Sequence, residues 1–158
     1  MMNISSIKQR DEEHIKKVYP LRYQRALKYK DHSDYLTCLG AYLLLEKALG
    51  EFDEKKITLS KNGKPSLEGY PFFNYSHSGN FVVLVVDKIH EVGIDVQIFD
   101  KKHPRKFIKE WTKKEAITKL TGEGIKPHQE IPSTYEEKRI HVFHKRVTLK
   151  YVVSIATI

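Results

Sequence analysis

The sequence predicts a chain of mixed helices and β-strands. Apolar residues recur at helical spacing in two long segments, 34–49 and 106–120. Segment 81–86 is instead continuously apolar, and segment 92–99 alternates in polarity, as strands do. With 158 residues, 40% of them hydrophobic, the chain has room for one core or for two small packed halves.

The first predicted helix follows a polar start to the chain. Pro20 stands near its first turn, and Arg22 and Arg25 lie three residues apart on one face. Such a face is either a solvated basic surface or a contact for phosphate. The next helix, 34–49, is expected to begin after an N-cap at Ser33 and to end at Gly50.

The middle of the chain predicts strands and tight turns. Alternation around Ile57 indicates a strand, and Asn62-Gly63 indicates a turn, after which Lys64-Pro65 places a cation on a restricted loop. A helix is expected to run from Pro104 and to close at Gly122 and Gly124. Segments 139–147 and 149–158 are expected to form a final pair of strands, preceded by a loop around 127–138.

Charge and cysteine content narrow the class of protein. The net charge of +8 favours an anionic partner, but the basic residues are spread along the chain, which weakens a nucleic-acid interpretation. Cys38, the single cysteine, is expected to be a small buried residue of a helix. With no secretory signal or membrane-length apolar run, we expect a cytoplasmic monomer.

Two segments place acidic groups beside apolar stripes. In a strand, Asp95 and Gln97 share one face, and an acid there needs a metal, a cation or a hydrogen-bond donor. On the later helix, Phe107, Trp111, Glu115 and Lys119 follow at intervals of four, so Glu115 continues the apolar stripe. Glu115 and Lys119 are alternatively an ordinary surface ion pair, and Trp111 is expected in the core.

The segment Asn74–Gly79 is expected to be a loop between two strands. Its hydroxyls, N–H groups and imidazole suit a phosphate. A Ser76–His77 nucleophile pair is disfavoured, since adjacent side chains point apart and no nucleophile elbow is present. The histidines also lack the spacing of zinc ligands.

Four segments in this order resemble the signature of the Sfp-like 4′-phosphopantetheinyl transferases: GKP (63–65), FNYSHS (73–78), VGIDVQ (92–97) and WTKKEAITKLTGEG (111–124). The resemblance implies an α+β fold in a single domain, with similar halves, about 1–88 and 89–158, packed around a cofactor cleft. It implies transfer of phosphopantetheine from coenzyme A to a serine of an acyl or peptidyl carrier protein. Such holo-carrier synthases need Mg²⁺ and serve fatty-acid or secondary-metabolite biosynthesis.

The resemblance also implies roles for individual residues. Asp95 and Glu115 match Mg²⁺ ligands, with Gln97 where the family usually has a glutamate. Lys119 matches the lysine near the reacting pyrophosphate, and Glu115 is the candidate acceptor of the serine proton. The expected coenzyme A contacts are Lys64, Ser76, His77, Arg22, Arg25 and Lys114.

Two departures from the family pattern leave alternatives open. An amide such as Gln97 is a weaker ligand for Mg²⁺ than a carboxylate, and only thirteen residues separate Gln97 from Trp111, where the family has a longer helical segment. The alternatives are a relative that binds coenzyme A or the carrier without efficient transfer, and a basic nucleic-acid-binding module.

Overall fold

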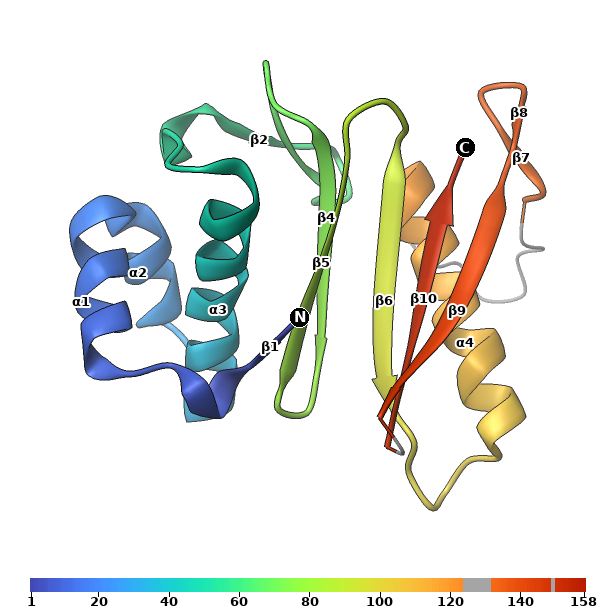
Figure 1. Cartoon of the computed structure of the whole chain (residues 1–158), viewed down its shortest axis with the longest axis horizontal. Helices are drawn as coiled ribbons and strands as arrows, with labels where there is room; N and C mark the ends of the chain where they lie inside the picture. The colour runs from blue at the N-terminus through green and yellow to red at the C-terminus, as the bar shows by residue number, and fades with distance from the viewer. Residues whose placement is uncertain (124–131, 149) are drawn as a thin grey trace.

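Two antiparallel three-stranded sheets and four α-helices make up most of the part of the chain that the structure describes (Figure 1). The computed structural model describes residues 1–123, 132–148 and 150–158. One sheet has the order β1-β5-β4 and the other β6-β10-β9. The α+β class expected from the resemblance is confirmed, while the division into similar halves, 1–88 and 89–158, stays a prediction.

The first sheet is covered by helices that come before it in the chain. It consists of β1 (Met2–Asn3), β4 (Phe72–Ser78) and β5 (Phe81–Asp87), and α1 (Gln9–Val18), α2 (Pro20–Ala26) and α3 (His32–Leu49) lie on one side of it (Figure 1). The core between them includes Tyr19, Leu39, Leu45 and Phe73, all at most 2% exposed. Cys38 is buried in α3, as expected. Shorter elements complete this region: η1 (Ile4–Ser6), η2 (Glu54–Lys56), and the hairpin of β2 (Ile57–Leu59) and β3 (Pro65–Leu67).

The second sheet packs directly against a single helix. It consists of β6 (Val92–Ile98), β9 (His141–Thr148) and β10 (Tyr151–Thr157), with α4 (Arg105–Thr121) across its outer face (Figure 1). Gly93 permits this contact, because a Cβ there would lie 2.1 Å from the carbonyl oxygen of Ala116. The small hairpin of β7 (Thr134–Tyr135) and β8 (Lys138–Arg139) precedes β9.

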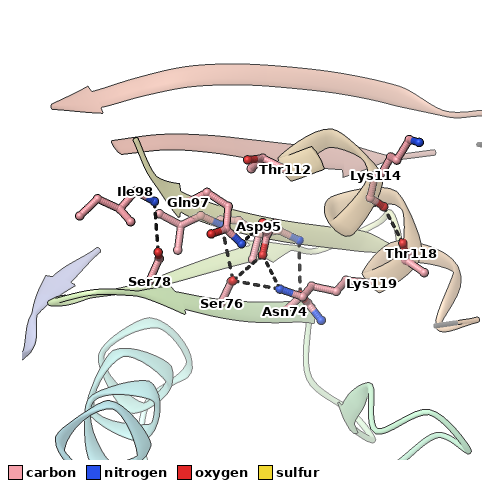
Figure 2. A network of polar contacts seen from close by, with 12 residues as sticks. Asn74, Ser76, Ser78, Asp95, Gln97, Ile98, Thr112, Lys114, Thr118 and Lys119 are labelled. Carbon is pink, nitrogen blue, oxygen red and sulfur yellow. Dashed lines mark hydrogen bonds and ion pairs between the residues drawn. The ribbon is translucent and has the colours of Figure 1, made fainter. Parts of the chain in front are cut away.

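Side chains of β4 join the two sheets. Asn74 Oδ1 accepts the N–H of Ile94 at 3.3 Å, Ser76 Oγ that of Val96 at 3.4 Å, and Ser78 Oγ that of Ile98 at 3.1 Å (Figure 2). Every second residue of β4 thus meets every second N–H on the edge of β6 that faces away from β10. We call this set of contacts the side-chain ladder. Because it fixes the register of β4 against β6, it sets where the polar groups of the two strands meet.

Some local expectations are wrong. Asn74–Ser78 is a strand and not a loop. The side chains of Asn74, Ser76 and Ser78 face β6, and those between them face the helices. Asp31, not Ser33, caps α3, accepting the N–H groups of Ser33 and Asp34. The polar start contains α1, which was not expected. Gly122 ends α4 in the left-handed region, as expected, whereas Gly124 and part of the expected loop 127–138 lie outside the described residues.

Across the described part of the chain, no helix combines the length and apolar character that a membrane crossing requires.

Candidate active site

Asp95 is the centre of a polar cluster between β4, β6 and α4. Its side chain is 3% exposed, and its Oδ1 accepts hydrogen bonds from Ser76 Oγ at 2.8 Å and from Lys119 Nζ at 2.6 Å (Figure 2). Gln97 Nε2 lies 3.3 Å from Oδ2. The side chains of Asp95 and Gln97 therefore share a strand face, as the alternation of β6 predicts.

Lys119 provides the positive charge that makes this buried carboxylate tolerable. An unpaired charge in such a place is costly, whereas a charge-assisted bond of 2.6 Å with further donors compensates it. Lys119 Nζ also donates to Ser76 Oγ at 2.9 Å, while that hydroxyl donates to Asp95. The three groups thus hold one another in place.

Glu115 lies one turn before Lys119 on the same face of α4. Burial raises the pKa of its carboxyl above the usual range, the charge of Asp95 raises it further, and Lys119 acts in the opposite direction. With Lys119, Lys64 and Asn74, Glu115 lines a cavity of about 220 Å³. We call this the acidic cavity after Glu115, the one carboxylate in its lining, although Lys64 and Lys119 line it as well.

Lys64 closes one side of the acidic cavity. Its ammonium forms an ion pair with Glu91 and donates to the carbonyl oxygen of Leu120, 2.7 Å away. Nearby, Asn62 Nδ2 donates to the carbonyl oxygen of Gly122 at 2.6 Å. The turn before β3 is in this way attached to the C-terminal end of α4, where cations interact favourably with the helix dipole.

A second cavity, of about 210 Å³, lies on the other side of β4 and is lined by Arg22, Arg25, Asp34 and His77. We call it the basic cavity. Arg22 is only 7% exposed, and within the described ranges no carboxylate side chain forms an ion pair with its guanidinium. Its Nε donates to the carbonyl oxygen of Cys38 at 2.7 Å, and the guanidinium lies 4.5 Å from the centre of the Tyr42 ring.

His77 is on the basic side of β4, opposite in direction to Ser76. Desolvation against the cavity wall lowers the pKa of His77; Asp34 and Asp95 act to raise it, and Lys119 to lower it. Tyr75 contributes to the lining of both cavities. Strand β4 is therefore the common wall of the two cavities. The prediction of a loop in this segment did not include that role.

Two predicted residues lie apart from the cavities. Lys114 is exposed on α4 and lines neither of them. The placement of Trp111 in the core is wrong, since its side chain is 39% exposed. The buried face of α4 is instead formed by Ile108, Thr112, Ala116, Ile117 and Leu120. Glu91 and Tyr75 were not predicted as site residues, because the sequence marks them only by polarity and by position in a strand.

Glu115 in the lining of the acidic cavity, and Asp95, which contacts the lining residue Lys119, are the candidate ligands of a Mg²⁺ ion. Over the described residues, no three or more histidine, cysteine, aspartate or glutamate side chains form a metal-binding group. Asp95 and Glu115 nevertheless supply two carboxylates, and Mg²⁺ is commonly bound through one or two carboxylates together with waters and substrate phosphates. The residues present therefore fit Mg²⁺ bound jointly with a phosphorylated ligand.

Comparison with characterised families gives two informative relatives and no matching family model. A putative 4′-phosphopantetheinyl transferase of Synechocystis is 29% identical over 136 residues, covering 66% of this chain and 54% of the relative. The 4′-phosphopantetheinyl transferase HetI of Nostoc is 29% identical over 124 residues, covering 59% and 50% respectively. The chain therefore spans about half the length of the curated relatives it matches.

Proposed function

From the premise that this chain is a relative of the 4′-phosphopantetheinyl transferases, we propose that it transfers phosphopantetheine from coenzyme A to a serine of a carrier protein. The products are the holo-carrier and 3′,5′-ADP. The observation that carries the proposal is the buried Asp95, paired with Lys119 and followed by Glu115 at a cavity. The curated names support the general reaction, and the Mg²⁺ requirement is part of the proposal.

In this proposal Asp95 and Glu115 hold Mg²⁺, with Gln97 contributing an amide oxygen or a water contact. The bound ion would neutralise charge on the pyrophosphate oxygens of coenzyme A. Ser76, expected to contact coenzyme A, instead has its hydroxyl directed at Asp95. We therefore assign Ser76 to positioning that carboxylate, together with the side-chain ladder.

The basic cavity is suited to a phosphate group of coenzyme A. Arg22 and Arg25 supply guanidinium groups, and His77 supplies an imidazole from the common wall. The planar guanidinium group of arginine binds phosphate through paired hydrogen bonds. Lys64 borders the acidic cavity, and its ammonium donates to Glu91 and to the carbonyl oxygen of Leu120, which leaves a third N–H for a phosphate oxygen.

The transfer step follows from these positions. Glu115 accepts the hydroxyl proton of the carrier serine, directly or through a water molecule. The serine oxygen forms a bond to the phosphorus that carries pantetheine, and the bond from that phosphorus to the oxygen of 3′,5′-ADP breaks. The ammonium of Lys119 lies beside the acidic cavity to stabilise the charge that develops on the phosphate oxygens.

One observation favours a second candidate, a relative that binds coenzyme A or the carrier without efficient transfer. The amide nitrogen of Gln97 faces Asp95, and the ammonium of Lys119 already neutralises that carboxylate. Both contacts would have to rearrange before Mg²⁺ bound to Asp95. A site without transfer would keep these contacts in the presence of coenzyme A.

A single incubation separates the two candidates. The protein is mixed with coenzyme A, Mg²⁺ and a panel of apo-carrier proteins, and each carrier is weighed by mass spectrometry. Transfer predicts a gain of one phosphopantetheine, which a chelator abolishes. Tight coenzyme A binding in calorimetry without any mass gain would support the second candidate, and strongly salt-dependent nucleic-acid binding with neither result would contradict both.

A further inference from the structure

Among the described residues, Asp34 is the one acid in the lining of the basic cavity. It shares that lining with Arg22, Arg25 and His77. The arginines lie on α2, Asp34 on α3 and His77 on β4, so three elements meet there. A cavity that served only to hold an anion would exclude a carboxylate, since like charges repel at close range. The presence of Asp34 therefore indicates a second requirement on the ligand.

The helical spacing of α3 directs Asp34 to the basic cavity. Thr37, Cys38 and Ala41 follow it on the same face of the helix, and all of them also line the cavity. Thr37 is 7% exposed and Cys38 4%, so this is the packed face of α3 and not its solvent face. Asp34 itself is exposed. Its carboxylate is therefore at the mouth of the cavity.

The local structure of α3 does not account for Asp34. The cap of this helix is Asp31, which accepts the N–H groups of Ser33 and Asp34 at 2.7 and 3.3 Å. The helix dipole favours an acid in the first turn but does not require it on the face that borders the cavity. Asp34 is thus available for a contact outside the helix.

Asp34 and the cations of the basic cavity influence one another without forming a closed pair. Desolvation lowers the pKa of His77, and the charge of Asp34 is the largest influence in the opposite direction. Over the described ranges, however, Asp34 forms no ion pair with His77 or with either arginine. The cavity therefore presents an acceptor and several donors as separate contact points.

A ligand that satisfies both kinds of group carries an anion and a hydrogen-bond donor side by side. The guanidinium groups of Arg22 and Arg25 donate to phosphate, whereas a carboxylate only accepts. A ribose with a phosphate on one carbon and a free hydroxyl on the next offers this combination. In the dinucleotide sites of doubly wound sheets, an acidic side chain accepts a hydrogen bond from a ribose 2′-hydroxyl in this way. In coenzyme A, the 3′-phosphate and the 2′-hydroxyl are such neighbours.

We propose, resting on the proposed transferase function, that Asp34 is a specificity-determining residue that accepts a hydrogen bond from the ribose 2′-hydroxyl of coenzyme A. The two arginines and His77 hold the adjacent 3′-phosphate. Without the hydroxyl, the carboxylate of Asp34 faces the phosphate and repels it. A site built to bond a hydroxyl rejects the ligand that lacks it, because the polar group of the site is then left unpaired. Asp34 thus makes the basic cavity select a ribonucleotide over its 2′-deoxy counterpart.

Binding of 3′,5′-ADP tests the proposal without carrier protein or Mg²⁺. Calorimetry would compare 3′,5′-ADP with 2′-deoxyadenosine 3′,5′-bisphosphate, which lacks only the 2′-hydroxyl. We expect the wild type to bind the ribonucleotide about tenfold more tightly, as one hydrogen bond to a charged group allows. In Asp34→Ala this preference should fall to about twofold or less. In Asp34→Asn, whose amide oxygen still accepts a hydrogen bond, part of the preference should remain.

The ratio of the two affinities separates recognition from structural damage. A substitution that only distorts α2 or α3 weakens the binding of both ligands alike and leaves their ratio unchanged. The matched control is Glu13→Ala, which removes an exposed acid of α1 outside the lining of the basic cavity. This control should keep the wild-type ratio.

The outcomes also separate the role of Asp34 from the transfer reaction. A preference for the ribonucleotide that disappears in Asp34→Ala supports the proposal even if no carrier gains phosphopantetheine, in which case the proposed function alone has failed. If carriers gain mass but the wild type and Asp34→Ala show the same ratio, the role assigned to Asp34 is wrong. It is also wrong if neither nucleotide binds to the wild type.

Discussion

The two cavities on either side of β4 differ in how their charges are balanced. At the acidic cavity, the lining residue Lys119 forms an ion pair with the buried Asp95 at 2.6 Å. In the basic cavity, Arg22 is buried without an ion-pair partner among the described residues. The difference suggests that the basic cavity can bind an anion as it stands. At the acidic cavity, contacts between protein side chains have to be replaced by contacts to a ligand.

The largest effect is expected from removing the proposed base of the acidic cavity. Glu115→Gln keeps the shape of the side chain and removes its charge, so transfer should fall by about 10²–10⁴-fold. Carrier mass measured over time gives the rate. Glu110→Gln, an exposed change on the same helix, should leave the rate within about twofold. Near-wild-type transfer by the Glu115 variant would show that another group accepts the proton.

The basic cavity should instead respond through affinity for coenzyme A. Arg25→Ala removes a charge-assisted contact to phosphate, and the KM for coenzyme A should rise about tenfold or more while kcat changes little. His77→Ala should act in the same direction and less strongly. If the cavity holds the 3′-phosphate, the loss should shrink when dephospho-coenzyme A is the substrate. Equal losses with both substrates would locate these side chains elsewhere on the ligand.

Gln97→Glu tests the contrast between the two cavities by adding a second acid beside Asp95. Charges about 4 Å apart interact by roughly 4 kcal/mol at an effective dielectric constant of 20, before desolvation offsets part of this. We expect the variant to unfold at a lower temperature without Mg²⁺ and to gain more than the wild type when Mg²⁺ is added. Half-maximal transfer should need less Mg²⁺. Thermal unfolding curves over a Mg²⁺ titration test this, and identical curves for both proteins would remove Gln97 from the metal site.

The smallest expected effect is a shift in the titration of His77. In the ligand-free protein its pKa lies below the usual 6.5, because desolvation favours the neutral ring. A bound phosphate favours the protonated ring, so 3′,5′-ADP should raise the pKa. Affinity for 3′,5′-ADP should therefore strengthen as the pH falls through the pKa of the bound form and weaken as the pH rises. NMR titration of the imidazole resonances, with and without 3′,5′-ADP, measures both values.

The fold was predictable where periodicity was strong. The apolar repeats of 34–49 and 106–120 predicted α3 and α4, and the alternation of 92–99 predicted β6. Helix α1 was missed because it buries only Ile15, although acids in its first turn and lysines in its last are typical of a helix. Segment 74–78 was mistaken for a loop because the side-chain ladder requires polar residues at strand positions.

The candidate site was predictable in part. The shared face of Asp95 and Gln97 and the helical spacing of Glu115 and Lys119 follow from strand and helix geometry. The direct bond between Lys119 and Asp95 was not predictable, since it depends on the close packing that Gly93 allows between β6 and α4. The exposure of Trp111 was missed for a similar reason. The spacing of apolar residues predicts a helix, but it does not show which face of that helix packs against the sheet.

The side-chain ladder has a consequence for how the chain behaves in a crowded solution. A strand edge with unpaired N–H groups is a template on which another chain can add a strand and begin to aggregate. On β6, the N–H groups of Ile94, Val96 and Ile98 are all occupied by β4. The contacts that join the two sheets thereby also protect β6 against intermolecular strand pairing.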